Sequence, residues 1–252
     1  MSESKHSVRF PGETDAYRAA RDKLVDAEIE LVEILNRSRL SGVLCRSAAS
    51  CLRITRSWNS HRDKIPATVR LSELFADGKR TLIIYSFMFG PKMERACPSC
   101  TSILDGLDGE TPHVTQRVNF AVVAKSPIEQ IMNFAESRGW RNLRLLSSAN
   151  NTYNRDYHGE DADEDQIPAL NVFVKRDGAI HHFYNTELLY APSEPGQESR
   201  HVDSIWPLWN LFDETPEGRG QDWNPKLAYR KTCAVWWSKI RPSPARNFSP
   251  AF

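Results

Sequence analysis

The fold is decided by the stretch Thr81–Phe89, TLIIYSFMF, and by the motif Cys97-Pro98-Ser99-Cys100 that follows it. Thr81–Phe89 is rich in β-branched and aromatic residues and predicts a buried strand. Pro98 favours the start of a helix, because the first helical position needs no backbone N–H. The unpaired N–H groups at such a helix end stabilise a thiolate, so we expect Cys97 to be more acidic than a free thiol. The two cysteines can close a small disulfide ring, and their setting predicts redox chemistry.

The composition argues against several classes of function. The 252 residues carry a formal net charge of +1, from 33 basic and 32 acidic side chains. This balance gives no general attraction to nucleic acid or to an anionic membrane. No apolar stretch approaches the roughly 20 residues that span a bilayer, and the N-terminal MSESKH lacks the apolar core of a secretion signal. We therefore expect a cytoplasmic protein with no nucleic-acid partner and no membrane partner.

The cysteines do not form the pattern of a disulfide framework or of a metal site. There are five of them, an odd number, and Cys97 and Cys100 alone have a motif spacing. A C-x-x-C pair can be half of a zinc site, but no second pair completes it. The histidines His113, His158, His181 and His182 also lack the spacing of ligands. The acidic run Glu160–Asp165 has no EF-hand pattern and predicts a solvated loop. We therefore expect no metal. A zinc site and a pair of inert thiols are the two alternatives to redox chemistry.

The N-terminal part predicts one long amphipathic helix. The stretch from Glu13 to Arg37 contains no Gly or Pro. One helical face collects the apolar residues Tyr17, Ala20, Leu24, Ala27, Leu31, Ile34 and Leu35. We expect residues 1–40 to form a helical arm for docking or for homodimerisation. The composition shifts to Ser, Arg and Cys without periodicity over residues 38–61, so we expect a linker of uncertain order over residues 41–68 and give no role to Cys45 and Cys51.

The patterns that follow predict an α/β domain over residues 69–220. Strand-like runs lie at residues 81–89, 118–124, 143–146, 169–175 and 179–184. One helix is expected from the dithiol onward and another over residues 126–138, with Gly139 as its stop. Asp177-Gly178 predicts a two-residue hairpin turn. Parallel units followed by an antiparallel hairpin indicate a mixed sheet, and a polar tail is expected over residues 221–252.

Several blocks of the sequence resemble one known family. They are Val8–Glu13, Leu71–Phe75, Tyr85–Pro91, Cys97–Cys100 with Leu104–Leu107, and Leu211–Gly220. These blocks are similar to the thioredoxin-like family catalogued as domain of unknown function 899, whose members are predicted to be dithiol-disulfide oxidoreductases. The likeness is continuous from Val69 to about Gly218, whereas residues 38–61 depart from it. It implies a thioredoxin-like, peroxiredoxin-related mixed sheet flanked by helices, with the N-terminal helical arm attached.

The resemblance also implies roles for the residues of the motif. Cys97 as thiolate would attack a substrate disulfide, and Cys100, one helical turn on and less exposed, would resolve the mixed disulfide. Pro98 would fix the geometry of the ring, with Ser99 and Arg95 in support. The expected reaction is thiol-disulfide exchange with a protein or small-molecule disulfide or thiol. No Gly-rich dinucleotide fingerprint is visible, so we expect no cofactor.

A proline before the strand that faces the dithiol is a further requirement of this fold. Pro168, preceded by Ile167, holds that place in the sequence. We therefore predict a cis Ile167–Pro168 peptide bond beside the two sulfur atoms. The backbone before Pro168 would then be free to pair with a substrate.

Two other functions stay open at the level of sequence. The course of strand, Phe-x-Phe-Gly-Pro loop and cysteine also fits a peroxiredoxin-like thiol peroxidase. Such enzymes have a threonine where this chain has Glu94, and a carboxylate there repels a thiolate. Arg95, Arg141 or Arg144 would have to supply the positive partner. The other alternative is a non-catalytic binding module, in which the long N-terminal helix and the Trp-rich C-terminal region make an interface. Ala96, in place of the tryptophan found before the dithiol in many thioredoxins, favours a specialised partner.

Overall fold

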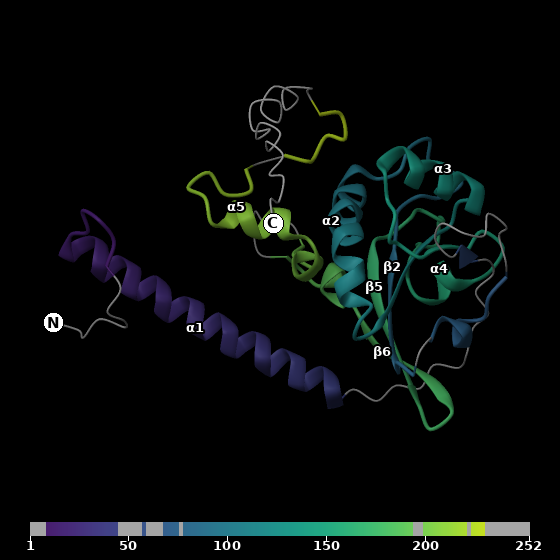
Figure 1. The fold of residues 1–252 in the computed structure, drawn as a ribbon, viewed down its shortest axis with the longest axis horizontal. Coiled ribbons are helices and arrows are strands. Elements are labelled where there is room, and N and C mark those ends of the chain that lie inside the picture. Colours follow the sequence, from purple (N-terminus) through teal and green to yellow (C-terminus); the bar gives the residue numbers. More distant parts are fainter. Residues whose placement is uncertain are drawn as a thin grey trace, which may run out of the picture.

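A computed structural model describes residues 9–44, 57–58, 68–75, 78–193, 199–220 and 223–229. Helix α1 (Asp15–Leu44) forms a long arm that extends from an α/β body (Figure 1). The body holds the dithiol. Cys45, Cys51, Cys233 and most of the predicted linker and tail lie outside the described residues.

In the described part of the chain, six strands form one sheet in the order β1-β4-β3-β2-β5-β6. The strands are β1 (Ser57–Trp58), β2 (Thr81–Ser86), β3 (Asn119–Ala124), β4 (Leu145–Ser147), β5 (Ala169–Arg176) and β6 (Ala179–Asn185). β2, β3 and β4 run parallel, whereas β5 pairs antiparallel with both β2 and β6. β2 is therefore central, and its last residue, Ser86, lies beside the first residue of β5, Ala169.

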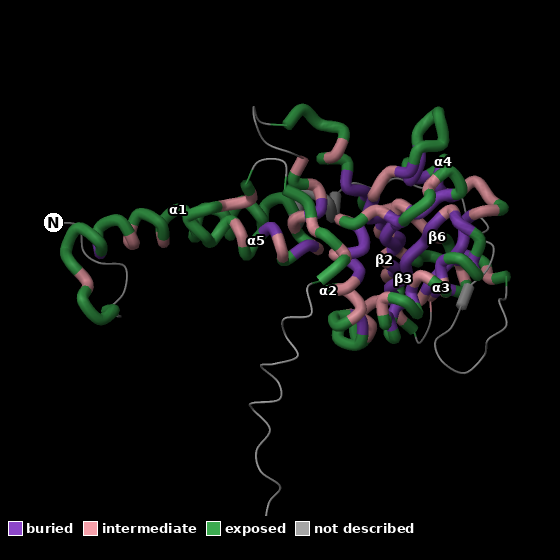
Figure 2. The backbone as a smooth tube through the Cα atoms, turned by 90° about the horizontal axis from the view of Figure 1, so that it is seen from above, coloured by how far each residue is buried: buried purple, intermediate pink, exposed green. Residues whose placement is uncertain are grey.

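The two faces of the sheet carry different elements, because alternate residues of a strand point to opposite sides. Tyr85 and Val122 face helices α2 (Pro98–Val114), α3 (Ile128–Arg138) and α5 (Pro207–Asp213) in one core. Ile84 and Val123 face the short helices η1 (Leu71–Leu74) and α4 (Tyr153–Asp156) in a second core. The burial colours in Figure 2 show the middle of the sheet as deeply buried, and every residue of β3 and β4 is buried. Two further short helices are η2 (Glu187–Tyr190) and η3 (Asp203–Ile205).

This architecture confirms the predicted fold class, an α/β thioredoxin-like mixed sheet flanked by helices with an N-terminal helical arm. The helix predicted over residues 126–138 is α3, and Gly139 ends it with a φ of 77°. Asp177 and Gly178 form the predicted hairpin turn with φ values of 51° and 77°. The third strand begins two residues later than predicted, at Leu145.

The segment predicted as a linker contains more structure than its composition indicates. Helix α1 runs on to Leu44, past the predicted end of the arm. Ser57–Trp58 pairs antiparallel with β4 and adds an edge strand to the sheet. The predicted boundaries between arm, linker, domain and tail stay predictions. No helix of the described residues combines the length and the apolar character that crossing a membrane requires.

The packing of α2 on the sheet generates a first prediction. Leu104 of α2 is fully buried against the sheet, whereas Leu211 of α5 is 65% exposed. Leu104→Ala should lower the free energy of unfolding by about 2–5 kcal/mol, because the cavity left in the core cannot close completely. Leu211→Ala should change it by no more than about 0.5 kcal/mol. Urea denaturation followed by tryptophan fluorescence measures both, and equal losses would contradict this packing.

Candidate functional site

The loop after β2 carries the dithiol and is fixed by backbone hydrogen bonds. The carbonyl oxygen of Phe89 accepts from the backbone N–H of Ser126 at 3.0 Å and from its hydroxyl at 2.9 Å. The N–H of Cys97 donates to the carbonyl oxygen of Met88 at 3.1 Å. Cys97 is thereby fastened to the extension of the central strand.

The dithiol lies at the N-terminus of α2, as the sequence predicts. Cys97 is the N-cap residue and Pro98 occupies the first helical turn. Thr101 donates to the carbonyl oxygen of Cys97 from its backbone N–H at 3.0 Å and from its hydroxyl at 2.8 Å. These bonds close the first turn of the helix beneath the Cys97 side chain.

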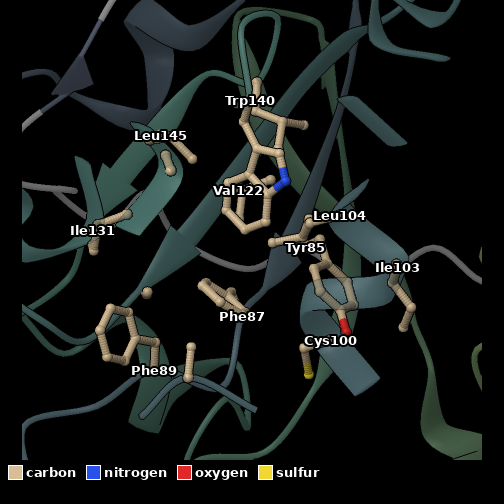
Figure 3. Packing of buried hydrophobic residues seen from close by; sticks show 14 of the residues in the cluster. Tyr85, Phe87, Phe89, Cys100, Ile103, Leu104, Val122, Ile131, Trp140 and Leu145 are labelled. Carbon is tan, nitrogen blue, oxygen red and sulfur yellow. The ribbon is translucent and has the colours of Figure 1, made fainter. Parts of the chain in front are cut away.

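The two thiols have unequal environments. Cys97 is partly exposed, whereas Cys100 is 2% exposed and belongs to the core that lies between α2 and the sheet. Figure 3 shows Cys100 beside Tyr85, with Ile103 and Leu104 on the same helix. A reagent can therefore reach the sulfur of Cys97 more easily than that of Cys100.

The environment of Cys97 stabilises its thiolate. A hydrogen bond from the Cys100 thiol is the largest effect that lowers the pKa of Cys97, which falls to about 6 although partial burial acts against it. The backbone N–H groups of Cys100 and Ser99 lower this pKa further. The helix N-terminus thus acts on the thiolate through individual N–H donors. Cys97 is ionised at neutral pH.

The same hydrogen bond has the opposite effect on Cys100. Because the Cys100 thiol is the donor, its bond to Cys97 raises the pKa of Cys100 well above the ordinary value, and burial raises it further. The pair therefore holds one proton, on Cys100, over the neutral range.

Tyr85 is a residue of this site that the sequence patterns did not single out. Its side chain is 0% exposed, and its hydroxyl has no hydrogen-bond partner of good geometry among the described residues. The hydroxyl lies beside Cys100 (Figure 3), and this neighbourhood lowers the pKa of Cys100 while burial raises the pKa of Tyr85. A tyrosine in an otherwise aliphatic strand core was the available signal, since a buried phenol requires a partner.

The charged residues before the dithiol do not set the acidity of Cys97. Lys92 donates to the carbonyl oxygen of Asp163 at 2.6 Å and pairs with Glu164 at 3.4 Å, so it holds the acidic loop. Glu94 and Arg95 are exposed. Arg95 is not among the groups that shift the pKa of Cys97.

Part of the predicted tail packs close to the dithiol helix. The hydroxyl of Ser99 donates to the side-chain oxygen of Asn224 at 3.2 Å. Trp223 packs edge-on against Trp209 and Phe212 of α5. Residues 223 and 224 therefore contact α5 and the first turn of α2.

The predicted cis peptide bond before Pro168 is wrong, because the Ile167–Pro168 bond is trans. Pro168 does directly precede β5, whose first residue pairs with the last residue of β2. The N–H of Ile167 donates to the carbonyl oxygen of Gly159 at 2.9 Å, so it is not free to pair with a substrate. This hydrogen bond holds the residues just before β5 against the preceding loop. The trans isomer is compatible with the bond and is also the intrinsically favoured one.

The loop that carries the dithiol packs against the loop before Pro168 at Gly90. A Cβ atom at Gly90 would come within 2.7 Å of the Gln166 side chain, so glycine permits this close approach. Gln166 in turn accepts a hydrogen bond from the Asn154 side chain at 2.9 Å. The loop that precedes Pro168 therefore supports the loop that carries the dithiol.

The backbones of Arg141 and Arg144, two arginines considered for a peroxidase site, are bound to α2 and β3. The backbone N–H of Arg141 donates to Asp108, ten residues along α2 from Pro98, at 2.8 Å. The carbonyl oxygen of Arg144 accepts from Val122, next to the start of β4. Leu145 pairs with Val122 and Val122 pairs with Tyr85, so Arg144 lies two strands away from β2. Neither residue is among the groups that shift the pKa of Cys97.

The acidic run is only partly the solvated loop that the sequence predicts. Residues 161–165 are exposed, but Glu160 is 8% exposed and pairs with Lys125. The carboxylate of Asp161 accepts from the N–H groups of Asp163 and Asp165 at 3.0 and 2.9 Å, which forms a compact turn. Within the described ranges, no group of three or more metal-ligating side chains is placed to hold an ion.

The chain belongs to the family described as "Bacterial protein of unknown function (DUF899)", whose profile matches residues 7–241. No curated protein matches the sequence.

Solved structures with a similar course of the chain include peroxiredoxins. Thioredoxin peroxidase I of Plasmodium yoelii is 16% identical, with 72% of this chain and 99% of that chain covered and a TM-score of 0.42. A cysteine-to-serine mutant of Xanthomonas campestris peroxiredoxin Q is 12% identical, covers 67% and 96% of the two chains, and has a TM-score of 0.42. Peroxidoxin BcpB of Mycobacterium tuberculosis is 15% identical over 64% and 95%, with a TM-score of 0.40. Similarities with such low sequence identity do not indicate which reaction this protein catalyses.

The unequal thiols generate a second prediction, on pH dependence. Alkylation of Cys97 by iodoacetamide, followed at the peptide level by mass spectrometry, should reach half its maximal rate near pH 6. In Cys100→Ala the midpoint should rise, because the main donor to the thiolate is lost. A midpoint near the ordinary thiol value in the unaltered protein, or one unmoved by Cys100→Ala, would contradict the assigned hydrogen bond.

Proposed function

We propose that this protein is a thiol-disulfide oxidoreductase in which Cys97 is the nucleophile and Cys100 is the resolving thiol. The observation that carries the proposal is the asymmetry of the pair: an accessible, acidic Cys97 and a buried, protonated Cys100 share one hydrogen bond at a helix N-terminus. Nucleophilic attack on a substrate requires an accessible thiolate, which Cys97 provides. Release of the substrate from Cys97 requires a second thiol within reach, which Cys100 provides.

The reaction begins at Cys97. Its thiolate sulfur forms a bond to one sulfur of a substrate disulfide, and the substrate S–S bond breaks. The leaving substrate sulfur departs as a thiolate and takes a proton from solvent. Pro98 fixes the start of the helix, and the backbone N–H groups of Ser99 and Cys100 hold the Cys97 thiolate in place before the attack.

Cys100 completes the exchange. Once Cys97 is bound to the substrate, its sulfur no longer carries the charge that keeps the proton on Cys100. Cys100 then loses its proton and attacks the Cys97 sulfur, and the second substrate sulfur leaves with a proton. The substrate disulfide gains two electrons and the dithiol becomes a disulfide, which an external thiol reductant reduces again.

The class of substrate follows from access to the motif. Cys97 and its neighbours Arg95 and Pro98 lie at the surface of the body, so the disulfide of a protein or of a small molecule can approach. We include Arg95 as a charge beside the incoming substrate. Ile167 and Pro168 are proposed to line the approach, without the N–H pairing that was predicted for Ile167.

A disulfide reductase assay tests the proposal and gives the third prediction. The full chain with Cys45, Cys51 and Cys233 replaced by serine is the reference, with dithiothreitol as reductant and insulin as substrate. Cys97→Ser in this background should abolish activity, and Cys100→Ser should trap a mixed disulfide at Cys97. Unchanged activity in Cys97→Ser would refute the oxidoreductase. Turnover of hydrogen peroxide without disulfide reduction would show a thiol peroxidase instead.

The Tyr85 hydroxyl is proposed to stabilise the Cys100 thiolate during resolution. It is buried beside Cys100 without another partner among the described residues, and it can donate to the negative sulfur when Cys100 loses its proton. Hydrogen bonds to charged groups are worth about 1.5–3 kcal/mol. Loss of this bond should therefore slow resolution by roughly tenfold or more.

The fourth prediction measures that step with an aromatic disulfide. When the reduced reference chain reacts with 5,5′-dithiobis(2-nitrobenzoate), attack by Cys97 releases the first thiolate and attack by Cys100 releases the second. Tyr85→Phe should slow the second phase and leave the first unchanged. Tyr153→Phe is the matched control, because Tyr153 is also buried with an unpaired hydroxyl but lies in the core on the other face of the sheet. Equal behaviour of the two variants would refute the role of Tyr85.

A further inference from the structure

The apolar face of helix α1 has no cover from the described part of the chain. Figure 2 shows α1 as an exposed arm beyond the body. Leu24, Leu31 and Ile34 are 42%, 55% and 46% exposed. A helix gains most of its stability in a protein by burying such a face against something else.

The spacing of the apolar residues indicates which kind of structure can pack against this face. Six apolar residues follow steps of three and four residues in strict alternation, at Tyr17, Ala20, Leu24, Ala27, Leu31 and Ile34, whereas the exposed Ile29, Val32 and Leu35 lie off this line. This is the seam of a coiled coil, with Tyr17, Leu24 and Leu31 at one core position and the other three residues at the second. The seam indicates a second helix as the occupant.

We infer that α1 pairs with α1 of a second copy of this chain, in antiparallel orientation. In that arrangement Ala20 lies opposite Leu31 of the second copy, and Leu24 lies opposite Ala27. Every alanine in the seam then faces a leucine, so the layers have an even volume. A parallel pair would instead set Ala20 against Ala20 and Ala27 against Ala27, which leaves two layers underfilled.

The charges beside the seam favour the same orientation. In the antiparallel pair Lys23 flanks Glu30 of the second copy, and Arg21 flanks Glu28. Two-fold symmetry repeats each contact, so four oppositely charged pairs border the seam. The parallel pair brings together Lys23 and Glu28 but sets Glu30 beside the apolar Leu35. Glu28 and Glu30 are exposed on α1 and available for these contacts.

The arrangement also leaves both dithiols open. A helix of 30 residues is about 45 Å long. Each body follows the C-terminal end of its own α1, so an antiparallel pair sets the two bodies at opposite ends of the helix pair. Dimerisation by this seam is therefore independent of the redox reaction.

The fifth prediction concerns the mass of the full chain in solution. Sedimentation equilibrium over a wide concentration range should show a dimer, with twice the 28.8 kDa of one chain. Leu24→Glu with Leu31→Glu should give a monomer. Ile29→Glu is the control, since Ile29 is 50% exposed but lies off the seam, and it should stay dimeric. A monomer in the unaltered chain, or a dimer that survives the double substitution, would overturn the inference.

Charge reversal tests the orientation. Lys23→Glu should weaken the dimer, and adding Glu30→Lys should restore it, because the pair is re-formed with its signs exchanged. Lys23→Glu with Glu28→Lys should not restore it. Rescue by Glu28→Lys instead of Glu30→Lys would show a parallel pair and overturn the antiparallel arrangement. Unchanged circular dichroism in each variant confirms that the helix is intact.

Discussion

One hydrogen bond, from the Cys100 thiol to the Cys97 sulfur, is the interaction on which the rest of the site depends. It lowers the pKa of one cysteine and raises that of the other, so two chemically identical groups acquire different roles. The bond exists because α2 begins at Pro98 and sets the two side chains one turn apart. Burial of Cys100 in the core between α2 and the sheet then keeps its proton from water.

The sheet supplies the rigidity that this bond requires. β2 is the central strand, and its extension holds Cys97 through the carbonyl oxygen of Met88. Behind the loop, Phe87, Phe89, Phe134 and Trp140 form a cluster of tilted and edge-on aromatic contacts. The Gln166 side chain also packs closely against Gly90 of the loop. The dithiol is therefore preorganised by groups that take no part in the exchange.

Much of this could be predicted from the sequence, because the deciding signals are local. The run Thr81–Phe89, the helix-starting Pro98 and the turn Asp177-Gly178 each specify their own conformation, and the sheet follows from their order. Contacts between distant segments were missed. Cys100, beside the Tyr85 hydroxyl, lies on α2, the N–H of Ile167 donates to Gly159, and the N–H of Arg141 donates to Asp108 in the second half of α2. Such pairings leave no periodic pattern in the sequence, so the role of Tyr85, the trans bond before Pro168 and the contact between Arg141 and Asp108 required coordinates.

The central claim is that Cys97 and Cys100 form a redox couple. Its most direct test is equilibration of the full chain in glutathione buffers of graded potential, followed by alkylation and peptide mass spectrometry. The account predicts that a disulfide between Cys97 and Cys100 appears and disappears in a single two-electron transition. Two thiols that stay alkylatable at every potential, or that pair with other cysteines instead of with each other, would contradict it.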